Sequence, residues 1–593
     1  MPLTRTSAPR RTSDADERAA PRLTPRTTPD MLARGPHEIV GRARTPGPRT
    51  QEASLRRIAS FVLASLVAAV AVAPGAALAQ DAPAKGGSIE LVAGGDLASL
   101  DNAQAVSTID YNMVAGALYE GLYSFDSSGT LQPRLADGMP EISADGLTYT
   151  FKIKPGAMFA GPDFTPREVT AADVAYGLTR AVDPKLVPAQ SWGAGYLFPI
   201  KGATEFSNGT ADSIEGIKVI DDHTLQVTLT APSVTFLFGL TIATSWPVPQ
   251  EAVEARGEDF ATNPVGAGPF MVQSWNKGSD ITLVRNPGYV DPALPYLDSM
   301  HVSLNTDENT QVLRIQDGEA DAVFESFSIS PASVRLLQSD ANITVTPSVG
   351  PRIYYLALDN EGPFKNKDLR LAVAHAMSTG FLAQFGDLAK PWNQLMSSAA
   401  AQSDPAGTKA PTYDPELAKQ LVKSGGYDGT PIIIVHDVTD PYSSANSTAL
   451  KQDLEAVGFT VDLRGLQSTE FFSAIYDPAQ FDISSTYWSA DYPDAQDYFS
   501  TNFVCANIGI LNISRFCDPD IDAALAATDL MPFGAERDQA LRDVQQRLID
   551  AVAGVPVMEV TPQVVWGPRV GDIPTLATYA PYDWKRAWVK AQG

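Results

Sequence analysis

The residues best suited to ligand chemistry lie in one stretch near the end of the chain, Phe481-Asp-Ile-Ser-Ser-Thr-Tyr-Trp-Ser-Ala-Asp-Tyr-Pro-Asp-Ala-Gln-Asp497. Trp488 and Asp491 suit a small molecule with a cationic head and an apolar body. The carboxylate offers a charge-assisted hydrogen bond, and the indole ring offers a flat wall or a cation–π face. Since turns favour Asp and Pro in any protein, an ordinary loop is the alternative interpretation.

The same stretch predicts the element that positions these side chains. Its first half alternates β-branched and aromatic residues with other types, which indicates a short buried strand, and Pro493 breaks it into a polar loop. A strand therefore delivers an aromatic ring and a carboxylate to its own end. The spacing also supports a second hypothesis, in which Asp491 and Asp494 act as the acid and base of a secreted hydrolase.

Other catalytic signatures are not found in the sequence. It has no His-Glu-x-x-His, no phosphate-cradling glycine loop, no dinucleotide fingerprint and no cysteine cluster for a metal, and it holds only 5 His. We therefore expect a binding protein rather than an enzyme, with no cofactor and no metal. The net charge of -25 argues against nucleic acid and anionic lipid as partners, because like charges repel.

The segment Trp488-Ser-Ala-Asp-Tyr-Pro-Asp494 resembles the Trp-x-Ala/Gly-Asp-Tyr/Asn segment of extracytoplasmic solute-binding proteins of the peptide and nickel class, family 5. Proteins of this class are the receptors of ATP-binding-cassette (ABC) importers. The resemblance implies that Asp491 binds the α-ammonium group of a peptide or related amine-bearing solute. It also implies delivery of that solute to permease subunits in the inner membrane, and we expect a monomer. A periplasmic chaperone that uses the same cleft for unfolded chains is a third hypothesis.

A longer motif carries the resemblance into the first half of the chain. Ser143-Ala-Asp-Gly-Leu-Thr-Tyr-Thr-Phe-Lys-Ile-Lys-Pro-Gly156 reads as a tight Asp-Gly turn and a strand with alternating faces. Thr170-Ala-Ala-Asp173 is a capping box, which predicts a helix over residues 171–181. Together they are very similar to the diagnostic segment of the same family. Its role there is structural, so we assign these residues no chemistry.

The resemblance also points to cleft residues in the first half of the chain. Tyr111 and Asn112 stand at a helix expected near residues 111–119, and in the family the residues just before this helix line the ligand cleft. A helix cap and its neighbour is the alternative interpretation, because Asn is a favoured N-cap.

Further cleft candidates lie in the second half of the chain. Gly350, Arg352 and Tyr354 begin a strand whose backbone pairs with the ligand in the family, although Arg352 equally suits a surface ion pair. Asp440-Pro-Tyr442 stands where dipeptide-binding relatives have Arg-Pro-Tyr, whose arginine binds the ligand's carboxylate, so both end residues are candidates. A carboxylate at this position repels a carboxylate. A free dipeptide is therefore disfavoured unless Arg352 substitutes.

The N-terminal region is interpreted as an export signal. Residues 1–53 are rich in Arg, Pro, Thr and Ala without hydrophobic periodicity, which indicates a disordered extension. Residues 54–79 combine a basic start, an apolar run and Ala77-Leu-Ala79, which predict a signal peptide cut after Ala79. No Cys stands at the cleavage point, so we expect a free periplasmic protein rather than a lipid-anchored one.

Export also bears on the two cysteines. In a reducing compartment, Cys505 and Cys517 lack the companions that a metal site needs. In the oxidising periplasm the same pair predicts one local disulfide that closes a loop.

The alternation of strands and helices predicts an α/β fold. With the resemblance, this becomes a two-lobed periplasmic binding protein of the Venus-flytrap type, large and type II-like, with an extra subdomain in the first lobe. The expected boundaries are a first lobe at 80–304 with a small subdomain at about 143–260, a second lobe at 305–556, and a return to the first lobe at 557–593.

Overall fold

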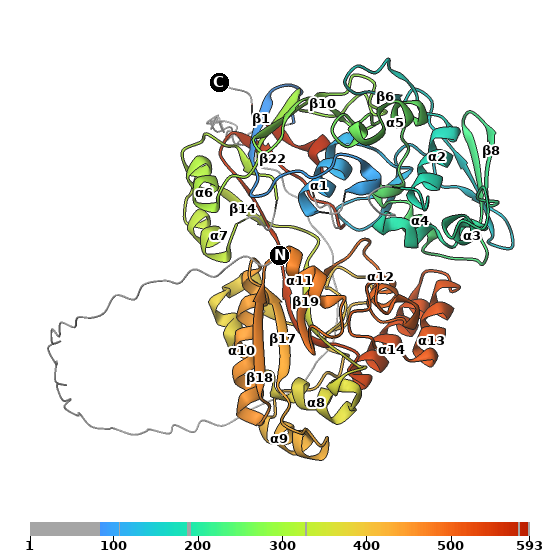
Figure 1. Ribbon diagram of the computed structural model, residues 1–593. Coiled ribbons are helices and arrows are strands. Elements are labelled where there is room, and N and C mark those ends of the chain that lie inside the picture. Colours follow the sequence, from blue (N-terminus) through green and yellow to red (C-terminus); the bar gives the residue numbers. More distant parts are fainter. Residues whose placement is uncertain (1–82, 106, 187–190, 326–328, 579–581, 591–593) are drawn as a thin grey trace, which may run out of the picture. The chain divides into compact units, whose positions relative to one another are not determined.

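A computed structural model describes residues 83–105, 107–186, 191–325, 329–578 and 582–590 (Figure 1). The extension and signal peptide expected over residues 1–79 lie outside the described residues. In the described ranges, no helix combines the length and the apolar character needed to cross a membrane.

The first lobe is built on a seven-stranded sheet with the order β10-β11-β12-β1-β13-β21-β14. Its central strand β1 runs parallel to both of its neighbours, β12 and β13. Ile89 and Leu91 of β1 are buried in one core and Val92 in another, as expected for a central strand covered on both faces. The strands are β1 (Ser88–Val92), β10 (Phe270–Asn276), β11 (Asp280–Arg285), β12 (Ser299–Ser303), β13 (Ala322–Val323), β14 (Thr344–Pro347) and β21 (Gln563–Trp566).

The first lobe also contains helices and short strand pairs. The helices are α1 (Thr108–Met113), α3 (Ala203–Ser207), α4 (Phe236–Gly239), α5 (Gln250–Arg256), α6 (Glu308–Gln316) and α7 (Pro331–Gln338). The short strand pairs are β2 (Tyr123–Phe125) with β3 (Leu131–Pro133), β6 (Met158–Phe159) with β7 (Arg167–Glu168), and β22 (Val570–Asp572) with β23 (Trp588–Val589).

A small four-stranded sheet belongs to the first half of the chain, with the order β4-β5-β9-β8. Tyr149 and Phe151 are buried while Lys152 is exposed, so the predicted alternation holds in β5. The predicted helix is confirmed as α2 (Ala171–Ala181), and it begins with the capping box of Thr170 and Asp173. The strands are β4 (Glu141–Ile142), β5 (Thr148–Lys152), β8 (Ile217–Asp221) and β9 (Thr224–Thr228).

The second lobe is built on a six-stranded sheet with the order β16-β20-β15-β19-β17-β18. Alternate residues of β15 divide between two cores: Tyr354 and Leu356 pack in one, and Ile353 and Tyr355 in the other. This follows from the strand period of two, which points successive side chains to opposite faces. The strands are β15 (Arg352–Leu358), β16 (Ala389–Pro391), β17 (Ile432–Asp437), β18 (Val461–Leu466), β19 (Ile483–Ser489) and β20 (Val555–Val560).

Helices cover both faces of the second sheet. Helix α10 packs along β17 and β18, and α8 and α9 lie beside it (Figure 1). The other face carries apolar side chains of α11 to α14. The helices are α8 (Lys367–Ala376), α9 (Pro415–Ser424), α10 (Pro441–Val457), α11 (Ser468–Ile475), α12 (Ala495–Asn502), α13 (Pro519–Asp529) and α14 (Ala535–Ala551).

Two expectations about chain organisation can be compared with this architecture. The predicted disulfide between Cys505 and Cys517 is present. The second lobe does not start near residue 305, because β13 and β14 still belong to the sheet of β1, and the second sheet begins with β15. Strand–helix alternation continues through residues 305–347, and it does not reveal which sheet a strand joins.

Candidate functional site

A buried pair of carboxylates follows β19, and a residue of the other lobe contacts both. The Tyr196 hydroxyl lies 2.5 Å from Asp491 Oδ2, to which it donates, and 3.1 Å from Asp497 Oδ1. All three side chains come together although Tyr196 precedes Asp491 by 295 residues. Because one hydroxyl has one proton to donate, it satisfies only one of the two acids at a time.

The indole of Trp488 belongs to this carboxylate pair. Its Nε1 donates to Asp497 Oδ2 over 3.0 Å, and the backbone N–H of Asp491 donates to the same oxygen over 3.1 Å. The polar edge of Trp488 is therefore used inside the protein, and a role of its ring as a wall for the ligand stays a prediction. Tyr196 and Asp497 were not identified as site residues from sequence. Tyr196 carries no local signal, whereas Asp497 stood in the stretch already singled out.

The electrostatics of the pair favour an incoming cation. Burial raises the pKa of Asp491 to about 7, although the hydrogen bond from Tyr196 opposes the rise. Burial and then the charge of Asp491 raise the pKa of Asp497 well above its ordinary value. Within the described part of the chain, no Lys or Arg nitrogen lies within 4.0 Å of either carboxylate. Two buried acids without a counter-ion are costly to ionise, and a cationic group beside them removes that cost.

A small cavity of about 40 Å³ lies beside Asp491. Tyr111, Thr241, Trp246 and Lys585 are among the residues that line it. The Lys585 ammonium is compensated within the protein, by Glu120 at 3.4 Å and by Asp583 at 3.7 Å. The volume suits a group the size of a water molecule or an ammonium head.

The helix expected near residues 111–119 begins earlier, and this changes the place of two predicted residues. Ser107 is the N-cap of α1, so Tyr111 and Asn112 lie inside the helix. The Tyr111 hydroxyl accepts a hydrogen bond from the backbone N–H of Ala243 over 2.9 Å, while Tyr111 also lines the cavity beside Asp491. Asn112 is buried, and its Oδ1 has no hydrogen-bond partner among the described residues. The alternative interpretation of Asn112 as a cap is therefore wrong.

A second and larger cavity, of about 280 Å³, gathers four of the predicted residues. Arg352, Tyr354, Asp440 and Tyr442 line it from the second lobe. First-lobe residues of α6 and α7, among them Glu308, complete the wall. The cavity thus lies between elements of the two lobes.

The predicted residues of this cavity bind one another. The Tyr354 hydroxyl donates to Asp440 Oδ2 over 2.7 Å. Asp440 Oδ1 is the N-cap of α10 and accepts from the backbone N–H groups of Tyr442 and Ser443 over 2.8 and 3.2 Å. Arg352 Cζ lies 3.9 Å from the centre of the Tyr487 ring. Asp440 and the Pro that follows it therefore also serve to start α10, because an Asp N-cap followed by Pro at the first helical position favours helix initiation.

The backbone of β15 does not serve as the predicted pairing edge. Tyr354 is paired on both sides, with Tyr487 of β19 and with Met558 of β20. A ligand strand therefore cannot add to the sheet at this residue, and the side chains of Arg352 and Tyr354 are what face the cavity. Gly350 precedes the strand and does not line either cavity among the residues described. Its contact with a ligand stays a prediction.

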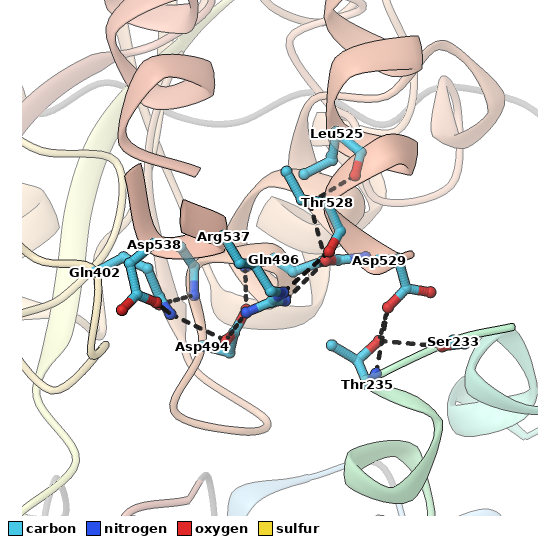
Figure 2. Close-up of polar contacts among 11 residues, drawn as sticks. Ser233, Thr235, Gln402, Asp494, Gln496, Leu525, Thr528, Asp529, Arg537 and Asp538 are labelled. Carbon is cyan, nitrogen blue, oxygen red and sulfur yellow. Dashed lines mark hydrogen bonds and ion pairs between the residues drawn. The ribbon is translucent and has the colours of Figure 1, made fainter. Parts of the chain in front are cut away.

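Asp494 serves a structural purpose, which Figure 2 shows. Its two carboxylate oxygens accept hydrogen bonds from Arg537 over 2.7 and 3.0 Å, and Gln402 donates to one of them over 3.2 Å. The same carboxylate is the N-cap of α12. Asp494 is therefore not available as an acid or base, and the hypothesis of a catalytic pair of Asp491 and Asp494 has no geometric support.

The same figure shows a further contact between the lobes. Thr235 donates to Asp529 Oδ1 from its hydroxyl over 2.7 Å and from its backbone over 3.2 Å (Figure 2). Nearby, the ring of Phe238 stacks on that of Phe533 with a centre-to-centre distance of 5.3 Å. Sequence reasoning found none of these residues, because each has an ordinary local context.

This geometry can be set beside known proteins. Residues 130–509 match the family described as bacterial extracellular solute-binding proteins, family 5 Middle. The chain belongs to this family. Its members are extracytoplasmic binding proteins, so the resemblance to family 5 and the two-lobed α/β fold are both confirmed.

Individual relatives extend over most of the chain. Di/tripeptide-binding protein 2 of Pseudomonas aeruginosa is 26% identical over 474 residues, which cover 77% of this chain and 86% of that protein. The glutathione-binding protein GsiB of Escherichia coli is 27% identical over 489 residues, which cover 79% and 88%. The periplasmic binding protein DppA from Helicobacter pylori, solved in complex with the peptide STSA, has a TM-score of 0.74 at 22% identity and covers 86% of this chain and 99% of its own. This last likeness concerns the fold.

Proposed function

We propose that this family 5 protein is the receptor of an ABC importer and binds a peptide or related amine-bearing solute between its lobes. The ligand's ammonium group binds at Asp491 and Asp497. The ligand then bridges both lobes and stabilises the closed state by its extra affinity for that state. The permease subunits in the inner membrane receive the ligand unchanged.

The observation that carries this proposal is the buried acid pair. Asp491 and Asp497 share a hydroxyl from the opposite lobe, and no Lys or Arg nitrogen of the described residues reaches them. A ligand ammonium supplies the missing positive charge and the missing donors together. Peptide- and glutathione-binding relatives are consistent with a ligand that carries such a group.

The remaining parts of the proposal concern the setting of the receptor. It acts as a monomer in the periplasm after removal of a signal peptide at residues 54–79. Tyr111 and the ring of Trp488 contribute to the wall around the ligand. The disulfide between Cys505 and Cys517 is compatible with an oxidising compartment.

Calorimetry with a matched pair of tripeptides tests the proposal. We expect tri-alanine amide to bind saturably and its N-acetylated form, which lacks the ammonium, to bind at least about 100-fold more weakly, since a desolvated charge pair contributes about 2–5 kcal/mol. Chromatography of the same samples after prolonged incubation should return the peptide intact. Equal binding of both forms would exclude the ammonium as the recognised group, and cleavage would support the hydrolase hypothesis.

The natural ligand can be sought without choosing a candidate. Mass spectrometry of small molecules released from the purified protein should detect a species with a primary amine. A released species without an amine would contradict the proposal.

A further inference from the structure

The larger cavity contains a buried positive group. Arg352 is buried, lies over the ring of Tyr487, and donates from Nε to the Ser489 hydroxyl over 3.0 Å. Burial opposes its charge, but the neighbouring Tyr487, Tyr354 and Asp440 outweigh burial and raise the pKa of the guanidinium. Arg352 therefore stays charged, and the negative charge of Asp440 in the same cavity favours its charged form.

Asp440 is the matching negative group. It is partly buried, and its carboxylate accepts hydrogen bonds from Tyr354 and from the first turn of α10. Burial raises the pKa of Asp440 above its ordinary value, and the charge of Arg352 together with these hydrogen bonds opposes the rise. Tyr354 thus links the acid to the neighbourhood of the guanidinium.

The rest of the cavity adds negative charge. Glu308, Glu325 and Asp437 also line it, and they come from both lobes. Of the described lining residues, Arg352 is the one Lys or Arg. A ligand carboxylate placed in this cavity therefore meets several acids beside the guanidinium. Like charges at such a site weaken binding.

The proposed function places the ligand's ammonium at Asp491, and the present inference rests on that placement. We propose that Asp440 determines the ligand class, so that the receptor selects amine-bearing solutes whose far end carries no free carboxylate, such as a peptide amide. Tyr354, Tyr442 and Tyr487 provide aromatic walls for an uncharged end. Asp440 acts by placing a negative charge in the same cavity as Arg352, which opposes the attraction of the guanidinium for a ligand carboxylate.

Replacing Asp440 by Asn isolates this effect. Asn is as good an N-cap as Asp, so α10 keeps its first turn. The amide oxygen takes the place of Oδ1 at the cap, and the amide nitrogen, in the place of Oδ2, donates to the Tyr354 hydroxyl, while the negative charge disappears. Asp440→Asn should therefore strengthen the attraction of Arg352 for a ligand carboxylate without disturbing the fold.

Asp437→Asn is the matched control. It removes one charge from the same cavity, but Asp437 accepts its hydrogen bonds from Thr439 in its own turn, over 2.7 and 2.8 Å. It leaves Arg352, Asp440 and Tyr354 in place. Its effect on ligand preference should therefore be small.

The experiment compares dipeptide acids with the corresponding dipeptide amides. The wild-type protein is incubated with one pool that contains both libraries, and released ligands are identified by mass spectrometry. The best-bound amide and its acid partner are then measured by calorimetry with all three proteins. We expect the wild type to bind the amide at least about tenfold more tightly than the acid. Asp440→Asn should remove or reverse this preference, and Asp437→Asn should change it by less than about threefold.

The outcomes separate this inference from the function on which it rests. If acids and amides bind the wild type equally, the assignment of Asp440 is wrong while the amine-binding receptor stands. If the wild type prefers amides and Asp440→Asn folds but keeps that preference, Asp440 is not its cause. If no member of either pool binds, the proposed function fails and this inference fails with it.

Discussion

Two groups of acids in the segment that follows β19 have opposite surroundings. Asp494 is held by both terminal nitrogens of Arg537 and is compensated within the protein. Asp491, only three positions earlier, shares with Asp497 a single Tyr196 hydroxyl. All three acids are buried to a similar degree. Burial alone therefore does not mark a binding site, whereas burial without a counter-ion does.

The largest expected effect is a loss of folding stability when the ion pair between Arg537 and Asp494 is broken. Arg537→Met leaves Asp494 buried without its counter-ion, which typically costs about 3–5 kcal/mol of stability. Urea unfolding measures this loss, and the double variant with Asp494→Asn should recover much of it. A change below about 1 kcal/mol in the single variant would show that Asp494 does not depend on Arg537. Ligand affinity of the remaining folded protein should be nearly unchanged.

Removing an acid of the uncompensated pair, Asp491 and Asp497, should weaken ligand binding and leave the stability of the fold nearly unchanged. Asp491→Asn should weaken binding of an amine-bearing ligand by about 100-fold or more, because the ligand's ammonium loses its charged partner. The variant should fold normally, since no internal ion pair is lost. Calorimetry measures the affinity, and circular dichroism at increasing temperature checks the fold. Unchanged affinity would remove Asp491 from the site.

In the ligand-free protein, the missing counter-ion of Asp491 should make folding stability depend on pH. The pKa of Asp491 is about 7 in the folded state, above the ordinary value of 3.8, so the folded state holds a proton that the unfolded chain has released. Stability from this group is therefore present below about pH 4 and is lost as the pH rises toward 7. The free energy of unfolding, measured in urea, should fall between pH 5 and pH 8 in the wild type. In Asp491→Asn this fall should be smaller by about 1–3 kcal/mol. Parallel pH profiles for the two proteins would contradict a raised pKa of Asp491.

The smallest effect on ligand affinity is expected from removing the Tyr196 hydroxyl, which connects the first lobe to Asp491 and Asp497. Tyr196→Phe removes a donor to Asp491 and should weaken ligand binding by about fivefold, since one hydrogen bond contributes about 1 kcal/mol. Calorimetry with the same ligand measures the loss. Tyr149→Phe is a suitable control, because its hydroxyl donates to the backbone of Ser233 within the first lobe. Equal losses in the two variants would mean that Tyr196 has no special role.

Local patterns predicted local structure well. The capping box at Thr170 gave α2 with the correct ends, and alternating residues gave β19 and the loop that follows it. The cysteine pair gave the disulfide. In each case the forces that decide the structure act between residues close in sequence.

The partners of buried charges could not be predicted in the same way. Arg537 and Tyr196 are far in sequence from Asp494 and Asp491, and neither has a distinctive neighbourhood. For the same reason the sequence did not show that Asp440 caps α10 and accepts a hydrogen bond from Tyr354. The start of the second lobe was misplaced because a strand's sheet depends on long-range pairing.

The central claim is that Asp491 has no counter-ion in the ligand-free protein and that a ligand's ammonium group supplies one. Calorimetry at pH 7 in two buffers of different ionisation enthalpy counts the protons exchanged when an amine-bearing peptide binds. Because burial raises the pKa of Asp491 and the group must ionise beside an ammonium, the wild type should release more protons per ligand than Asp491→Asn. Identical proton counts together with identical affinities would contradict the account.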